Sequence, residues 1–226
     1  MFHHYPPLSL PTLEQMNLKT GRVYHVLNGA DSGVHYPSIT RVLGAKPKPQ
    51  LEAWKRRVGH QEAQRVSQAA SGRGKKLHAL VEEYVGNHPI GTIEPHVNEL
   101  WQHLSPWLDA HITGVYGQEC DLYSRKLAVA GRTDMIATVD DGALAIVDFK
   151  QANRPKRPEY VGDYYLQGTF YSLALYELTG MQAKHIVIPV ASPEGLQVFV
   201  TQPKLHYQEL FKRIKDFYID LEMRSD

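Results

Sequence analysis

The sequence contains a single cysteine, Cys120, among its 226 residues. An internal disulfide and a cysteine-ligated iron–sulfur cluster both need further cysteines, so neither can form within this chain. No apolar run is long enough to cross a bilayer, and residues 1–7 lack the basic and apolar regions of a secretory signal and the arginine-rich pattern of a transit peptide. These absences predict a cytoplasmic protein without a membrane partner.

An overall excess of charge is also missing, because 25 basic residues face 24 acidic ones. The near balance hides a strongly basic segment between Arg41 and Lys76. Ten lysines and arginines lie there against only Glu52 and Glu62, so the local balance is ten minus two, or +8. Such a segment attracts polyanions and makes their binding dependent on salt. A solvated helix face with an unusual charge bias is the alternative.

Two short motifs carry the chemistry. Gly131-Arg132-Thr133-Asp134 is followed, fourteen positions after Asp134, by Asp148-Phe149-Lys150. Since side chains alternate along a strand, we expect Asp148 and Lys150 to share one face while Phe149 turns into the core. Residues 143–147 are wholly apolar, as in a strand that is buried on both faces. A charged trio at the end of such a strand is costly unless a bound cation compensates it; a simple local ion pair is the alternative.

The order of the expected elements indicates an α/β fold with a mixed central β-sheet flanked by helices. Residues 1–20 are expected to form a loosely tied, proline-rich arm, residues 22–36 a hairpin and residues 37–44 a short helix. Further helices are predicted at 51–70, 73–85, 95–112, 159–178 and 205–221, with Pro106 kinking or splitting the third of these. Strands are predicted near 117–127, 129–139, 143–150, 183–190 and 196–201, and residues 154–158 form a basic loop.

With this order in place, the chain resembles the PD-(D/E)XK nuclease superfamily, and within it the RecB-like exonucleases of the phage type and the mitochondrial genome maintenance type. The resemblance spans about residues 36–200. It is carried by these blocks, which together follow the family's order: Tyr36-Pro37-Ser38-Ile39-Thr40-Arg41-Val42-Leu43, Trp54, Gly72-Arg73-Gly74-Lys75-Lys76-Leu77-His78, the two motifs above, and Gln167-Gly168-Thr169-Phe170-Tyr171. The resemblance implies a restriction-endonuclease-like core with an N-terminal helical extension. It also implies that residues 1–226 form a single nuclease domain, with an arm at 1–20, a basic helical DNA-binding segment at 37–113 and a catalytic core at 114–226.

The resemblance also implies a metal centre. Asp134 and Asp148 would be direct ligands, the backbone carbonyl of Phe149 a further one, and His78 another, although a lone histidine beside an apolar stripe is often structural. Hard oxygen ligands suit Mg²⁺ or Mn²⁺, with one or two ions bound. Lys150 would orient or deprotonate the attacking water and stabilise the transition state.

Other residues are expected to support the site or to hold substrate. Glu119 would help to organise the centre, although the sequence does not separate it from Asp121, and Glu82 lies one turn after His78. The remaining candidates are Gln167 and Tyr171 with Tyr164 on one helix, Arg132 and Arg154 as phosphate contacts, Arg73, Lys75 and Lys76 in the basic segment, and Trp54 for stacking on a base.

The predicted function is that of a metal-dependent DNA exonuclease, a monomer that starts from a free single-stranded end in replication, recombination or repair. A replication or recombination protein is a candidate partner, and the resemblance implies a location in the cytoplasm of a bacterium or of a phage-infected host cell. A structure-specific endonuclease with the same core and a DNA-binding protein without catalysis are the alternatives. The iron–sulfur branch of the family is excluded because Cys120 stands alone.

Overall fold

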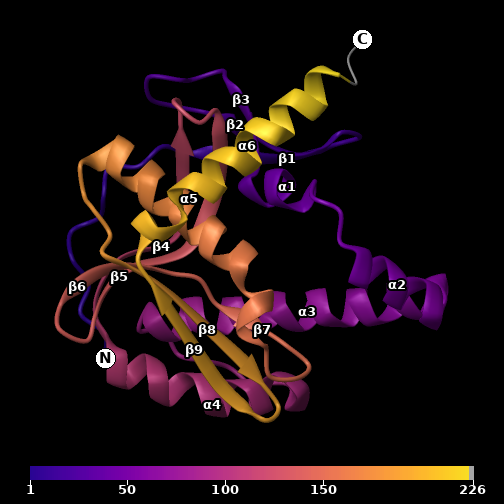
Figure 1. The fold of residues 1–226 in the computed structure, drawn as a ribbon. Helices are drawn as coiled ribbons and strands as arrows, with labels where there is room; N and C mark the ends of the chain where they lie inside the picture. Colours follow the sequence, from indigo (N-terminus) through magenta and orange to yellow (C-terminus); the bar gives the residue numbers. More distant parts are fainter. Residues whose placement is uncertain (224–226) are drawn as a thin grey trace.

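The computed structural model describes residues 1–223, and a six-stranded mixed sheet forms its centre (Figure 1). Antiparallel pairing joins the first three strands, β6 and β7 run parallel to β8, and β9 pairs antiparallel with β8. The strands are β4 (Ile112–Ser124), β5 (Val129–Val139), β6 (Ala143–Val147), β7 (Lys150–Gln151), β8 (His185–Ser192) and β9 (Gly195–Thr201). This sheet, with helices on both faces, confirms the predicted α/β class and is consistent with a restriction-endonuclease-like core.

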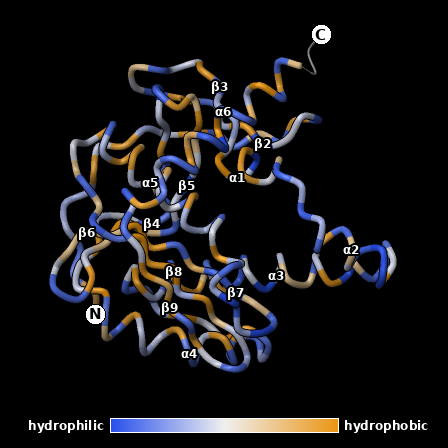
Figure 2. The backbone as a smooth tube through the Cα atoms, in the orientation of Figure 1, coloured by the Kyte–Doolittle hydropathy of each residue, from blue (hydrophilic) through white to orange (hydrophobic). Residues whose placement is uncertain are grey.

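Helices cover the two faces of the sheet and explain why its central strands are so apolar. On one face Met135 and Val147 pack with α3 (His60–Val85) and α4 (Pro95–His111). On the other, Ile136 and Ile146 pack with α1 (Ile39–Gly44), α5 (Gly162–Thr179) and α6 (Tyr207–Glu222). Neighbouring residues thus serve opposite faces, as strand alternation requires. Figure 2 shows the hydrophobic colour gathering along β8, in the interior.

The N-terminal arm is more firmly held than the sequence suggested. Residues 13–18 form β1 (Leu13–Leu18), which pairs with β2 (Gly21–Val26), and β3 (His35–Pro37) completes a second, three-stranded sheet. The prediction of a loose arm is wrong for this stretch, because Leu13 is buried in a small core together with Tyr24 and Tyr36. Earlier in the chain, Tyr5 N–H donates to the Val115 carbonyl at 2.8 Å.

One helical prediction is wrong, and one of the two outcomes expected at Pro106 is excluded. The break expected near residues 71–72 is absent, since α3 runs without interruption from His60 to Val85. The break falls instead at Gly59, whose φ of 85° ends α2 (Pro49–Val58). Helix α4 continues through Pro106 rather than splitting there. Helix α2 has no buried residue, and Figure 1 shows it projecting from the body at the start of α3.

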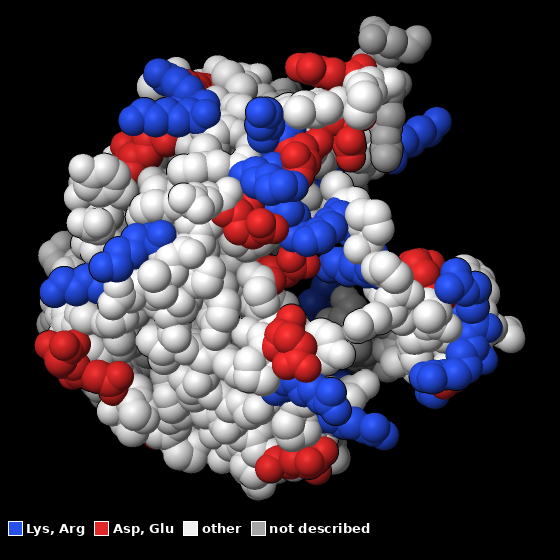
Figure 3. All heavy atoms as spheres, viewed as in Figure 1, with Lys and Arg blue, Asp and Glu red and all other residues white. Residues whose placement is uncertain are grey.

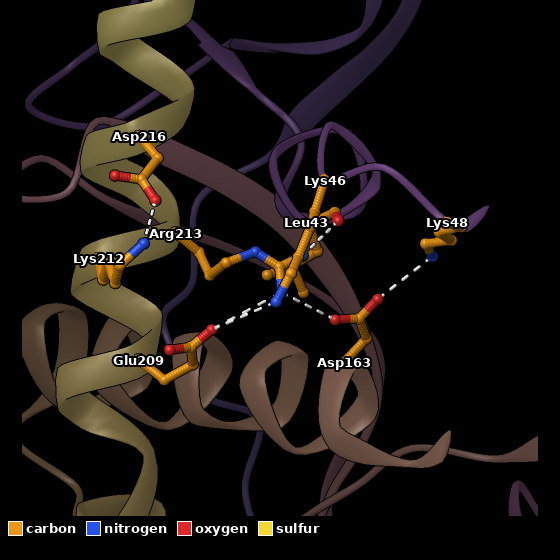
Figure 4. Close-up of polar contacts among 8 residues, drawn as sticks. All are labelled: Leu43, Lys46, Lys48, Asp163, Glu209, Lys212, Arg213 and Asp216. Carbon is orange, nitrogen blue, oxygen red and sulfur yellow. Dashed lines mark hydrogen bonds and ion pairs between the residues drawn. The ribbon is translucent and has the colours of Figure 1, made fainter. Parts of the chain in front are cut away.

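A buried arginine joins α1, α5 and α6. Arg213 on α6 is 7% exposed; its Nη2 donates to the Leu43 carbonyl at 2.6 Å and its Nη1 to Asp163 Oδ1 at 3.2 Å (Figure 4). The other oxygen of Asp163 lies 3.2 Å from Lys48 Nζ, just before α2. This network therefore fixes the point at which α2 leaves the body. Short 3₁₀ turns, Pro158–Tyr160 and Pro203–His206, precede α5 and α6. Within residues 1–223, no helix combines the length and the apolar character needed to cross a bilayer.

Candidate active site

The two motifs meet where the sheet is interrupted. Strand β6 ends at Val147 and β7 begins at Lys150; between them the Asp148 N–H still donates to the Val187 carbonyl of β8 at 3.0 Å, whereas Phe149 has no strand partner for its N–H. The predicted continuous strand over 143–150 is therefore wrong. Its physical cause is Asp134 on β5, whose Oδ2 accepts the Phe149 N–H at 2.7 Å. A side chain thus takes the place of a strand partner, and the Phe149 ring is buried, as alternation predicted.

Asp148 is the most deeply buried carboxylate of the site, at 1% exposure. Its Oδ2 forms an ion pair with Lys150 Nζ, whereas its Oδ1 has no hydrogen-bond partner among the described residues. Burial raises the pKa of Asp148 to about 6, although the Lys150 charge opposes this effect. Burial alone would lower the pKa of Lys150, but Asp148 and Asp134 outweigh it, so this pKa is raised and the ammonium stays charged. The pair leaves acceptor capacity on Asp148 unused.

His78 on α3 contacts both Asp134 and the backbone carbonyl of Phe149. Its Nδ1 lies 3.4 Å from Asp134 Oδ1, and its Nε2 lies 2.9 Å from the Phe149 carbonyl oxygen. Burial would raise the pKa of Asp134, but the hydrogen bond and charge of His78 outweigh it, and this pKa is lowered. The imidazole therefore lies between the carboxylate and the carbonyl that the sequence analysis named as metal ligands.

Glu119 joins this group, whereas Asp121 does not. Single ligand atoms of His78, Glu119 and Asp134 all lie within 4.8 Å of one another. Burial, reinforced by the Asp134 charge, raises the pKa of Glu119 to about 7. Asp121 instead accepts hydrogen bonds from Leu13 N–H at 2.8 Å and from Arg132 Nε at 2.7 Å. The structure thus separates two carboxylates that the sequence left equivalent, and it pairs Arg132 with Asp121.

Helix α5 supplies the aromatic side of the site. Gln167 Nε2 donates to the Tyr171 hydroxyl at 3.1 Å, and the Lys150 ammonium lies 5.4 Å from the centre of the Tyr164 ring. Burial, together with the charge of Asp148, raises the pKa of Tyr171 well above its usual value. The Tyr171 ring lies close to Gly131, where a Cβ would come within 2.9 Å of its Cε1. The glycine of the first motif is therefore needed for packing.

The basic candidates divide into paired and unpaired groups. Arg73 Nε donates to Gln151 Oε1 at 2.9 Å and its Nη2 to Asn153, while Lys76 is paired with Glu94. These partners lie 18 or more positions away in the sequence, and no local pattern predicted them. Lys75 is exposed on α3.

Trp54 and Arg154 lie together, beside α2 and α3. They line a cavity of about 760 Å³ whose other lining residues include Arg57, Lys156, Arg157 and Tyr160. Figure 3 shows this face hollowed between α2 and the body, with Lys and Arg side chains at its rim. Arg57, Lys156, Arg157 and Tyr160 were not singled out from the sequence, although the basic loop at 154–158 was the available signal. The arrangement combines positive charge with two aromatic rings.

The donor set fits a hard divalent cation. It comprises carboxylates, a backbone carbonyl and one imidazole, which suit Mg²⁺ or Mn²⁺ better than a thiophilic metal. The buried Asp148 Oδ1, which has no hydrogen-bond partner among the described residues, is the atom whose burial such an ion would compensate. Asp148 itself lies outside the group of three close ligand atoms, so the centre extends from Glu119 and His78 past Asp134 to the Asp148–Lys150 pair.

Comparison with known proteins gives one family. The sequence model of the PD-(D/E)XK nuclease superfamily matches residues 107–221, which include Asp134, Asp148, Lys150 and α5 but not His78. No curated protein matches the chain. Among 23 matching chains of solved structures is one titled "Crystal structure of SSO0001", which is 12% identical with a TM-score of 0.42, over 80% of this chain and 74% of that one. A likeness at this level decides nothing about function.

Proposed function

Because the protein belongs to the PD-(D/E)XK nuclease superfamily, whose sequence model matches just over half of the chain, we propose that it is a Mg²⁺- or Mn²⁺-dependent DNA exonuclease of the RecB-like type. The observation that carries the proposal is the convergence of Asp134, Asp148 and Lys150 at a break in the sheet, where His78 contacts Asp134 and the buried Asp148 Oδ1 has no hydrogen-bond partner among the described residues.

The metal ligands in this proposal are Asp134, Asp148, His78 and the Phe149 carbonyl, with Glu119 beside them. A bound divalent ion would offset charge on the phosphate and lower the pKa of a bound water. Asp134 also accepts the Phe149 N–H, and it thereby orients the carbonyl of that residue through the local backbone. His78 would bind the ion through one ring nitrogen, so metal binding competes with the contact that this nitrogen makes, either with Asp134 or with Phe149, while the other nitrogen can keep its partner.

Lys150 acts as a fixed positive charge. Its raised pKa keeps the ammonium protonated near neutral pH, which favours orienting the water and stabilising the phosphate over accepting a proton. The Tyr164 ring and the Asp148 carboxylate hold this ammonium in place. A preorganised cation of this kind typically contributes a factor of about 100 or more to the rate.

The cavity beside α2 supports a single-stranded DNA substrate. Arg57, Arg154 and Arg157 offer charge for phosphates, and Trp54 and Tyr160 offer faces on which bases can stack. Stacking together with a basic groove is how proteins hold single strands without reading their sequence. Alanine at one such aromatic position typically costs about 1–3 kcal/mol of binding per base.

Digestion of linear and circular single strands in Mg²⁺ tests the proposal. We expect the linear strand to be degraded and the circle to survive, with activity lost in Asp148→Asn and retained in Asp216→Asn, an exposed carboxylate paired with Lys212. Cleavage of the circle would replace the exonuclease with an endonuclease. DNA binding by the wild type without any degradation, in Mg²⁺ and in Mn²⁺, would leave a non-catalytic DNA-binding protein. Order of release from 5′- and 3′-labelled strands gives the polarity.

A further inference from the structure

A second cavity lies between three segments that are distant in the sequence. Its volume is about 530 Å³, and its walls are the turn between β1 and β2, helix α1 and the end of α6. Polar side chains line much of it, among them Asn17, Thr20, Arg22, Thr40, Arg41 and Asp220. Figure 1 draws α1, β1 and α6 together in the upper part of the molecule, whereas α4 lies in the lower part. None of the proposed metal ligands lines this cavity.

Arg41 is held in place on the wall of this cavity. Gly21 has a φ of 115°, and a Cβ there would lie 2.8 Å from Arg41 Cδ and 3.0 Å from its Nε. The glycine therefore leaves room for the arginine stem in the turn, where almost any other residue would displace it. On the far side, the Arg41 guanidinium carbon lies 5.4 Å from the centre of the Phe217 ring, within the range of a cation–π contact.

This ordered guanidinium has no acidic partner in residues 1–223. The structure gives Arg41 no ion pair with any carboxylate there, including Asp220 on the same cavity wall. The neighbouring Arg213 is different, because its donors are taken by Leu43 and Asp163. Five N–H donors in a fixed plane match the oxygens of a phosphate, and fixing the plane in advance lowers the entropy cost of binding.

We propose that this cavity binds a phosphate group of the nucleic-acid substrate, with Arg41 as the planar donor, Arg22 as a second charge and the hydroxyls of Thr20 and Thr40 as further donors. The inference rests on the proposed function, which supplies the phosphates. Gly44 and Ala45 line the cavity and α2 begins at Pro49, so a strand bound here would continue along the basic segment. A released mononucleotide carries the same group and is the second source to test.

Binding measurements in EDTA test the site without any need for catalysis. The probe is a fluorescein-labelled 20-nucleotide single strand, followed by anisotropy between 50 and 200 mM salt. We expect Arg41→Ala to weaken binding about tenfold, the loss of one charge-assisted contact, and to reduce the steepness of the log–log salt dependence by about 0.7. Arg41→Lys keeps the charge but not the fork, and should fall between Arg41→Ala and the wild type.

The matched control is Lys212→Ala, which removes an exposed, already paired positive charge from α6 and should change neither quantity. Thermal unfolding of each variant shows whether the fold is intact. Calorimetry with inorganic phosphate and with dAMP separates the two sources of the phosphate group. If Arg41→Ala loses affinity for either small ligand while its DNA affinity is unchanged, the cavity binds the released nucleotide rather than the strand. If a folded Arg41→Ala binds the strand, phosphate and dAMP as the wild type does, the inference is overturned. A wild type that cuts no DNA overturns the proposed function and leaves this measurement valid.

Discussion

Alanine at Gly168 tests whether the close approach of α5 to the sheet positions the site. A Cβ at this residue would lie 2.4 Å from Cγ2 of Ile186 and 3.2 Å from its Cγ1. Ile186 is fully buried on β8, so it cannot move aside without disturbing the sheet. The helix itself must then shift, and it carries Tyr164, Gln167 and Tyr171 with it.

Two opposing effects set the magnitude. Overpacking of a tight core costs about 1–3 kcal/mol, while exchanging glycine for alanine inside a helix gains about 1 kcal/mol. Since 2.4 Å is far below van der Waals contact, we expect the upper part of that cost to apply and a net loss of about 1–2 kcal/mol. For a chain of this length, the midpoint of thermal unfolding then falls by about 2–8 °C. Cleavage should fall about tenfold or more, because small displacements at a site are costly.

Gly72→Ala on α3 is the matched control. Nothing lies within 4 Å of a Cβ at Gly72 and it is exposed, so the same exchange should stabilise the protein by up to about 1 kcal/mol. Urea unfolding of both variants measures the difference, and a double-mutant cycle with Ile186→Ala should show a favourable coupling of about 0.5–3 kcal/mol. Equal stabilities for the two glycine variants, or a coupling of zero, would refute the reasoning.

The remaining predictions concern charge. Lys150→Ala should lower cleavage about 100-fold or more with little change in DNA affinity, measured by single-turnover kinetics and anisotropy; an equal loss of both would contradict a role in the transition state. Mn²⁺ at about 100 times its Kd should raise the unfolding free energy of the wild type by about 2.7 kcal/mol but not that of Asp134→Asn, and thermal unfolding with and without EDTA checks this. The Arg125 hydrogen bond, assisted by Tyr36, lowers the pKa of Asp31. Its stabilisation is therefore present above the unfolded value of 3.8 and lost as pH falls through the lower folded value. Asp31→Asn should thus destabilise the protein at pH 7 and lose that difference below about pH 4; a pH-independent difference in urea unfolding would exclude this linkage.

Local sequence patterns predicted most of the helices and strands. They failed where contacts between residues distant in the sequence determine the local structure. Residues 129–139 were predicted as a strand and form β5, because their alternation is local. Helix α3 was expected to break near residues 71–72. It continues because the Ala70 carbonyl accepts Gln151 Nε2 at 2.9 Å and Arg73 bonds to the same side chain, contacts made across about 80 positions. No local propensity contains that information.

The candidate site shows the same division. Alternation predicted that Asp148 and Lys150 would share one face, and in the structure the two side chains form an ion pair. It did not separate Glu119 from Asp121, which lie two positions apart on one strand. The difference comes from the partner strand, because Asp121 lies opposite Arg132 in the β4–β5 register and is neutralised by it. Glu119 has a φ of 48°, which is unusual for a residue other than glycine. No sequence pattern predicted this conformation.

The interruption of the sheet gives Asp134 two roles that ordinary mutagenesis would confuse. Its Oδ2 holds the Phe149 N–H at 2.7 Å, and its Oδ1 lies 3.4 Å from His78 Nδ1. Asp134→Ala would leave the Phe149 N–H without its acceptor and allow the chain around Asp148 to move, so lost activity would not by itself show metal binding. Asp134→Asn keeps a carbonyl oxygen for the Phe149 N–H while removing the charge. A variant that stays as stable as the wild type in EDTA, yet gains no stability from Mn²⁺, would assign the charge to the metal and the hydrogen bond to the backbone.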